Sequence, residues 1–94
     1  MDQPRTLSEL LYMAGGVKAV AELSAVSVDT VHRAARGSQS PSLATLEKIR
    51  RAVEELTRQA VTLDDMVRLW TVSAQDYRRQ RQLRARAREA RQGA

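Results

Sequence analysis

The residues best suited to chemistry in this sequence are four polar side chains inside the stretch Val28 to Arg36. Asp29, His32, Arg33 and Arg36 recur three or four positions apart, so they share one face if the stretch is helical. Guanidinium and imidazole groups donate hydrogen bonds, and the carboxylate accepts them. Such a face is suited to recognising another molecule, although an ordinary solvated helix face has the same pattern.

The rest of the composition argues against catalysis and against a metal site. The chain has no cysteine and one histidine, which excludes thiolate ligands and disulfides and leaves no histidine cluster. No paired carboxylates, activated nucleophile or phosphate-binding glycine loop is evident, and Gly15-Gly16 alone indicates the end of a helix. We therefore expect no enzyme activity, no metal and no cofactor.

The sequence also lacks membrane signals. No apolar run approaches the roughly 20 residues that span a bilayer, and the segment MDQPRTLSEL lacks the charged-then-apolar layout of a secretion signal. With no cysteine to suggest an oxidising compartment, we predict a cytoplasmic protein without membrane contact.

Helix signals divide the first 60 residues into four elements. Thr6 followed by Glu9 is a capping box, in which the carboxylate reaches back to the cap amide. Ser27 and Ser42 are predicted N-caps of later helices, and Gly37 ends the helix that begins after Ser27. The expected fold class is all-α, with helices at about 7–14, 17–24, 28–36 and 43–58 and a long C-terminal helix from about 63.

The predicted helix 43–58 has an apolar stripe and a charged face. The apolar residues recur at helical spacing: Leu43, Leu46, Ile49, Val53 and Leu56. The charged residues are interpreted as solvated surface: Glu47, Arg50, Arg51, Glu54 and Glu55.

The C-terminal helix has a second apolar stripe, spaced by threes and fours: Leu63, Met66, Val67, Trp70, Ala74 and Tyr77. A core of about 60 residues buries a modest share of its surface, so pairing with a second copy would help it. We predict these six residues as a dimer interface, with intramolecular packing of Trp70 as the open alternative. A second alternative is a separate helix beginning after Ser73.

Positive charge is concentrated at the C-terminus. Residues 1–77 carry nine Lys or Arg against ten Asp or Glu, for −1, whereas residues 78–94 carry seven Arg against one Glu, for +6. The seven are Arg78, Arg79, Arg81, Arg84, Arg86, Arg88 and Arg91. A terminal arginine run of this kind is often a nucleic-acid arm that adds salt-dependent affinity, and the alternative is a solvated tail.

The stretch AVAELSAVSVDTVHRAARG resembles the helix-turn-helix of bacterial and phage regulators, and VAELSAVSVDTVHR is also similar to the DNA-reading segment of Lac-type repressors. The following PSLATLEKIRRAVEEL resembles the fourth helix of the Cro/cI-like (XRE) class. The sequence departs from the family at Ala25, where a turn glycine is usual. We expect Ala25 not to be strongly left-handed, because a side chain disfavours positive φ.

The resemblance implies double-stranded DNA as the partner and helix 28–36 as the element in the major groove. It implies base reading by Val28, Asp29, His32 and Arg33. Arg33 is the first candidate for base reading, because a guanidinium can donate two hydrogen bonds to guanine. Asp29 would accept a hydrogen bond from cytosine or orient an arginine. It implies phosphate contacts from Lys18, Ser27, Thr30, Arg36, Ser38, Gln39 and Ser40. The amides of Gly16, Val17 and Lys18 are expected to be uncapped and to form a dipole end that suits a phosphate, with the Lys18 ammonium beside it.

The predicted organisation is a DNA-binding domain at 1–60, a possible dimerisation helix at 61–77 and a basic tail at 78–94. The resemblance implies a transcriptional regulator, with a repressor favoured, that binds a palindromic operator as a homodimer. The alternative is a protein-interaction module, antiactivator or antitoxin-like, that keeps the helix-turn-helix as scaffold and contacts a protein through its C-terminal helix.

Overall fold

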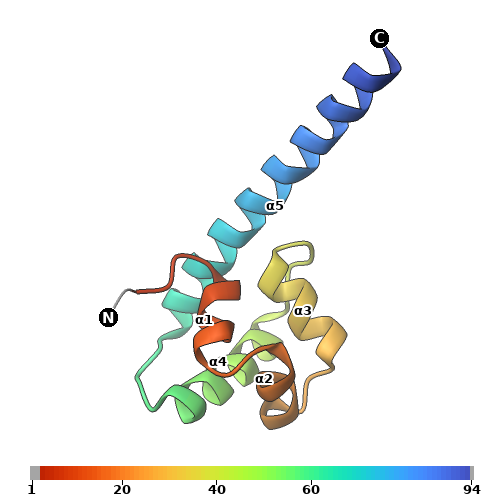
Figure 1. Ribbon diagram of the computed structural model, residues 1–94. Coiled ribbons are helices and arrows are strands. Elements are labelled where there is room, and N and C mark those ends of the chain that lie inside the picture. Colours follow the sequence, from red (N-terminus) through yellow and green to blue (C-terminus); the bar gives the residue numbers. More distant parts are fainter. Residues whose placement is uncertain (1–2, 94) are drawn as a thin grey trace.

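The computed structural model describes residues 3–93 of the chain, which form five α-helices joined by loops (Figure 1). In chain order they are α1 (Leu7–Met13), α2 (Val17–Ser24), α3 (Val28–Arg36), α4 (Leu43–Thr57) and α5 (Leu63–Gln92). No strand occurs among these residues. The predicted all-α fold is confirmed; each helix begins where the sequence placed it, and α1 and α4 end one residue earlier.

Side-chain caps explain where the helices begin. The hydroxyls of Ser27 and Ser42 each accept a hydrogen bond from the backbone amide three residues later, at 3.1 Å. Before α5, the Thr62 hydroxyl accepts from the Asp65 amide at 3.0 Å, and the Asp65 carboxylate accepts from the Thr62 amide at 3.2 Å. These hydroxyls and carboxylates satisfy amides that have no partner inside the helix.

The start of α1 differs from its prediction in one contact. The Thr6 hydroxyl accepts from the Glu9 amide at 3.1 Å, as expected. The Glu9 carboxylate, however, accepts from the Arg5 amide at 2.8 Å, one residue before the cap. The predicted contact to the cap amide is therefore wrong, and the carboxylate instead holds the incoming chain.

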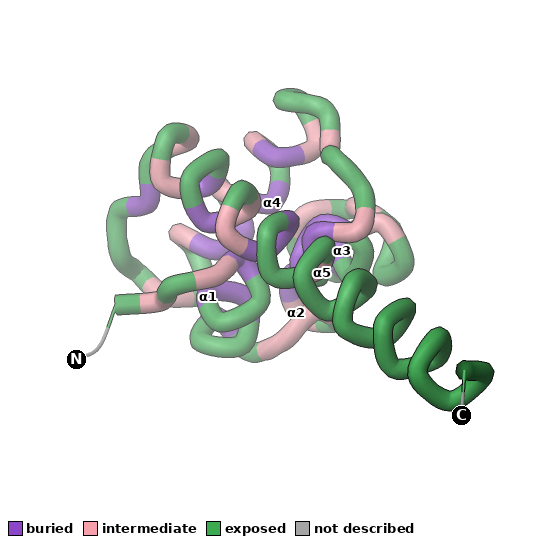
Figure 2. The backbone as a smooth tube through the Cα atoms, turned by 90° about the horizontal axis from the view of Figure 1, so that it is seen from above, coloured by how far each residue is buried: buried purple, intermediate pink, exposed green. Residues whose placement is uncertain are grey.

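The core lies where all five helices meet, and Figure 2 shows the buried positions gathered in the body. The largest fully buried side chains are Leu7, Leu11, Val20, Val31, Ile49, Val53 and Met66. In α4 only the middle of the predicted stripe is buried, since Leu43 is 66% exposed and Leu56 is 40% exposed. Both lie in the terminal turns of α4, so only Leu46, Ile49 and Val53 of the stripe are buried.

Arg50 is also placed differently from the solvated surface predicted for it. Its side chain is only 19% exposed. The guanidinium donates to Glu47 Oε2 at 2.7 Å, to Glu54 Oε1 at 2.6 Å and to the Val61 carbonyl at 3.0 Å. The hydrogen bond from Arg50 lowers the pKa of Glu47 to about 2. The Val61 amide, and then Arg50, lower the pKa of Glu54. This ionic network ties α4 to the segment that leads into α5.

The first half of α5 packs on the body and its second half projects beyond it (Figures 1 and 2). The helix continues through Ser73, so the alternative of a separate helix after that residue is wrong. Ser73 is buried, and its hydroxyl accepts a hydrogen bond from the Leu7 amide at 3.0 Å. That bond fixes the start of α1 to the middle of α5.

Candidate nucleic-acid interface

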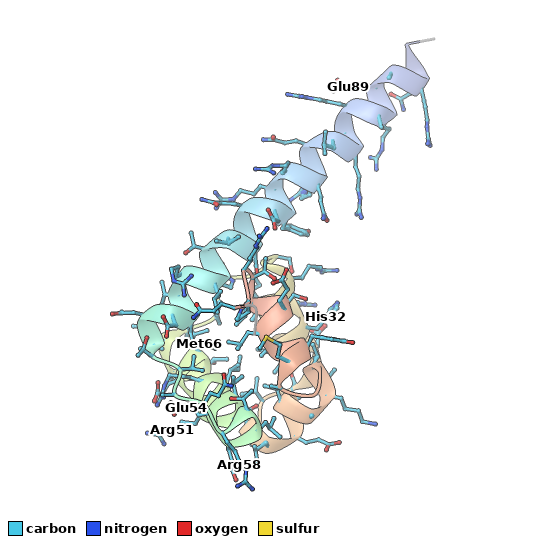
Figure 3. The ribbon with its side chains drawn as sticks, turned by 60° about the vertical axis from the view of Figure 1, so that its left-hand side comes forward. His32, Arg51, Glu54, Arg58, Met66 and Glu89 are labelled. Atoms are coloured by element: carbon cyan, nitrogen blue, oxygen red, sulfur yellow. The ribbon has the colours of Figure 1, made fainter. Side chains whose placement is uncertain are left out.

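α3 has one buried and one exposed face. Its buried residues are Val31, Ala34 and Ala35. The other face consists of the residues predicted to read bases or phosphates, and all are exposed: Val28, Asp29, His32, Arg33 and Arg36. Figure 3 places His32 on the side of the molecule away from Arg51 of α4 and from Arg58, which follows that helix. The packing therefore directs the whole polar face of α3 to the exterior.

The turn between α2 and α3 sets the angle of that face. Ala25 is left-handed, with φ 59° and ψ 26°, so the expectation for this residue is wrong. The neighbouring Ser24 hydroxyl compensates locally, since it accepts from the Val26 amide and donates to the Ala21 carbonyl, both at 3.3 Å. The left-handed alanine costs about 1–2 kcal/mol, which the packing of α3 must offset.

Arg33 and Asp29 form an ion pair on the exposed face. The Arg33 Nη2 atom lies 3.1 Å from Asp29 Oδ2, and the two side chains are 51% and 68% exposed. Arg33 Nη1 also donates to Gln39 Oε1 at 3.4 Å. Asp29 thus contacts a neighbouring arginine, as one of the two roles predicted for it requires.

The predicted phosphate-contacting hydroxyls divide into two groups. Ser27 donates to the Thr30 hydroxyl at 2.8 Å while it caps α3, so both side chains serve the helix start as well. Past the C-terminus of α3, the Arg36 guanidinium donates to the Ser38 hydroxyl at 3.4 Å. Ser40 is exposed in the same loop. The second group lies at the opposite end of α3 from Ser27.

Lys18 stands apart from these groups, exposed in the first turn of α2. Gly16 at the N-cap makes no side-chain cap, but its amide donates to the Leu11 carbonyl at 2.8 Å. The prediction that this amide is free for a phosphate is therefore wrong, because the chain reversal after α1 already uses it.

Two contacts that sequence reasoning missed hold α3 and its loop against α5. Trp70 Nε1 donates to the Gln39 carbonyl at 3.2 Å. A Cβ at Gly37 would clash with the backbone of Ser73 and Ala74. The sequence identifies Gly37 only as the end of a helix, because no neighbouring residue indicates which element packs beside a glycine.

Most residues of the predicted dimer stripe pack against the body of the same chain. Met66 and Ala74 are buried, which makes them unavailable to a second subunit and corrects the prediction for these two residues. Leu63 and Trp70 pack partly buried against the core, and Tyr77 is partly buried beneath Arg36, whose guanidinium carbon lies 5.6 Å from the ring centre. Val67 is 41% exposed. The stripe therefore attaches α5 to the body.

The seven tail arginines lie on the projecting half of α5, where every residue from 78 to 93 is exposed. This half begins next to Tyr77 and therefore beside the C-terminus of α3. Among residues 3–93 no group of His, Cys, Asp and Glu is arranged to hold a metal. None of the helices in that range has both the length and the apolar character needed to cross a membrane.

The chain matches no protein-family model. Comparison with curated proteins finds no significant match, and comparison with solved structures finds none either.

Proposed function

We propose that this protein is a regulator that binds double-stranded DNA sequence-specifically, with α3 in the major groove. The observation that supports it is the exposed polar face of α3 on a rigid, capped helix. A major groove about 12 Å wide admits one α-helix, and residues on the exposed face of that helix reach base edges. A regulator of this kind acts in the cytoplasm and needs no cofactor.

Within this proposal the side chains of α3 have separate roles. Arg33 donates to guanine, with Asp29 orienting its guanidinium. Val28 is half exposed and suits a thymine methyl group. His32 is the fourth base-reading residue. Phosphate contacts come from the two ends of α3 and from the start of α2: Lys18, Ser27, Thr30, Arg36, Ser38, Gln39 and Ser40.

One copy of α3 reads only a few base pairs, so we propose a homodimer on a palindromic operator with half-sites about 34 Å apart. The exposed Val67 and the partly exposed Leu63, Trp70 and Tyr77 are the residues of the predicted stripe that a second copy can reach. Repression follows from occupying the operator. Light scattering of the complex should give twice 10.5 kDa for the protein component. A protein monomer on DNA at micromolar concentration contradicts the dimer.

Selection of bound duplexes from a random-sequence library tests the function. Fluorescence anisotropy then compares the enriched duplex with a scrambled duplex of the same composition. Arg33→Ala should lose about 1–3 kcal/mol of this discrimination. Arg51→Ala is the matched control, because it removes an exposed guanidinium from the other side of the body. Equal affinity of the wild type for both duplexes would favour the protein-interaction module instead.

A further inference from the structure

One face of α5 runs unbroken from the body into the projecting half. Its members are spaced alternately four and three residues apart: Trp70, Ala74, Tyr77, Arg81, Arg84, Arg88 and Arg91. At about 100° per residue these seven positions fall within an arc of roughly 100°. We call the last four of them the arginine seam. The face thus changes from apolar or aromatic residues to arginines after Tyr77.

The first three members show which way the face points. Trp70 donates to the loop after α3, the backbone at Ala74 lies against Gly37, and the Tyr77 ring lies under Arg36. All three contacts are to α3 or to the loop that follows it. The arginine seam continues this face past the end of the body, so it overhangs the side on which α3 lies (Figure 1).

Nothing in the described part of the chain covers the arginine seam, since residues 78 to 93 are all exposed. Arginines three and four residues apart on one helix repel each other, and two seams brought together would repel more strongly. Pairing with a second copy through the arginine seam is therefore disfavoured. The face is apolar or aromatic where it packs on the body and cationic where it is exposed beyond the body. The exposed part is therefore suited to binding a polyanion.

We infer that the arginine seam binds the phosphate backbone of the same duplex that α3 reads, on the flank beside the C-terminus of α3. This inference rests on the proposed function. The projecting half, about 15 residues at 1.5 Å each, reaches roughly 22 Å, which corresponds to six or seven base pairs at about 3.4 Å. The contact adds affinity and lengthens the footprint without reading sequence.

The chain offers a matched control for the face. Arg79 and Arg86 lie about 180° around the helix from the seam and are spaced seven residues apart. Arg84 and Arg91 have the same spacing within the seam. The variants R84Q/R91Q and R79Q/R86Q therefore remove the same charge with the same spacing from opposite faces of one helix.

The experiment measures how the binding constant of the full chain depends on salt. It uses an enriched duplex with about ten base pairs beyond each end of the α3 site, and a duplex trimmed to that site. R84Q/R91Q should reduce the log–log salt slope on the long duplex by about 1.8 for each bound protomer, or about 0.9 per lost phosphate contact, and therefore by about 3.6 for a bound dimer. R79Q/R86Q should change it by less than half as much, and trimming the flanks should abolish the difference between the variants.

Equal salt slopes for the two variants on the long duplex would overturn the inference that the arginine seam binds phosphates. The proposed function would still stand if the wild type prefers the enriched duplex to the scrambled one. If the wild type binds both duplexes equally well and the two variants still differ in salt slope, the proposed sequence-specific function fails, and with it the flank position beside α3, while phosphate binding by the seam stands. A wild type that binds neither duplex overturns both.

Discussion

The backbone of Ser73 occupies the space that a Cβ atom on Gly37 would need. Gly37 ends α3 with φ 80°, and its amide donates to the carbonyls of Arg33 and Ala34, both at 3.1 Å. The glycine thus serves two purposes, because it allows a left-handed helix end and it lets α5 approach. The close approach of α5 to the end of α3 therefore requires glycine at this position.

Gly37→Ala should therefore lower the free energy of unfolding by about 3 kcal/mol or more, because a backbone clash adds to the cost of positive φ. Gly37→Asn separates the two causes. Asparagine tolerates a left-handed backbone better than alanine but carries the same Cβ. Urea unfolding should show both variants severely destabilised, and substantial recovery with asparagine would mean that φ alone, and not the approach of α5, requires glycine.

Ala25→Gly should stabilise the protein by about 0.5–1 kcal/mol. Removing the strain of a positive φ at alanine raises the free energy of unfolding by about 1–2 kcal/mol. The greater conformational freedom of glycine in the unfolded chain lowers it by roughly 0.5–1 kcal/mol. Ala44→Gly is the control, since Ala44 is exposed in the first turn of α4 and should lose stability. Thermal unfolding distinguishes them, and a lower midpoint for Ala25→Gly would refute strain at the turn.

The pH dependence of stability should report the Glu47–Arg50 contact. Because folding lowers the pKa of Glu47 from 4.5 to about 2, the contact stabilises the fold fully above about pH 4.5. That contribution is lost as the pH falls from 4.5 towards 2. Glu47→Gln should be less stable than the wild type at pH 7 and should lose less stability over that interval, as measured by urea midpoints.

Glu55→Gln is the control for this prediction, because Glu55 is an exposed carboxylate on the same helix. Its stability should fall with acid as steeply as that of the wild type. An identical acid response of Glu47→Gln and the wild type would show that the ion pair contributes nothing to folding.

Local signals were enough to predict the helices. Serine or threonine stands at each cap from Thr6 to Thr62 except before α2, and each such hydroxyl bonds the amide expected of it. Caps and apolar spacing act within one or two turns, so the sequence displays them directly. The exposed face of α3 followed from the same spacing.

Contacts between distant elements could not be predicted in this way. Nothing near Gly37 indicates that α5 passes beside it, and nothing near Trp70 indicates that its indole reaches the loop carbonyl of Gln39. Ala25 is left-handed because tertiary packing of α2 and α3 overrides the preference of an alanine. The arginine seam is visible in the spacing, but its orientation becomes known only when the apolar part of the face is seen against α3.

The ion pair between Asp29 and Arg33 gives the most direct test of how α3 would read DNA. The 3.1 Å contact favours one orientation of the guanidinium, whereas the carboxylate opposes the approach of phosphates. Asp29→Asn should therefore raise affinity for a scrambled duplex more than for the enriched one, so the ratio of the two affinities falls. Asp64→Asn removes the same charge from the first turn of α5 and should leave that ratio unchanged. Anisotropy titrations at one fixed salt concentration measure both ratios. An Asp29→Asn ratio equal to that of the wild type would mean that Asp29 neither orients Arg33 on DNA nor contacts a base.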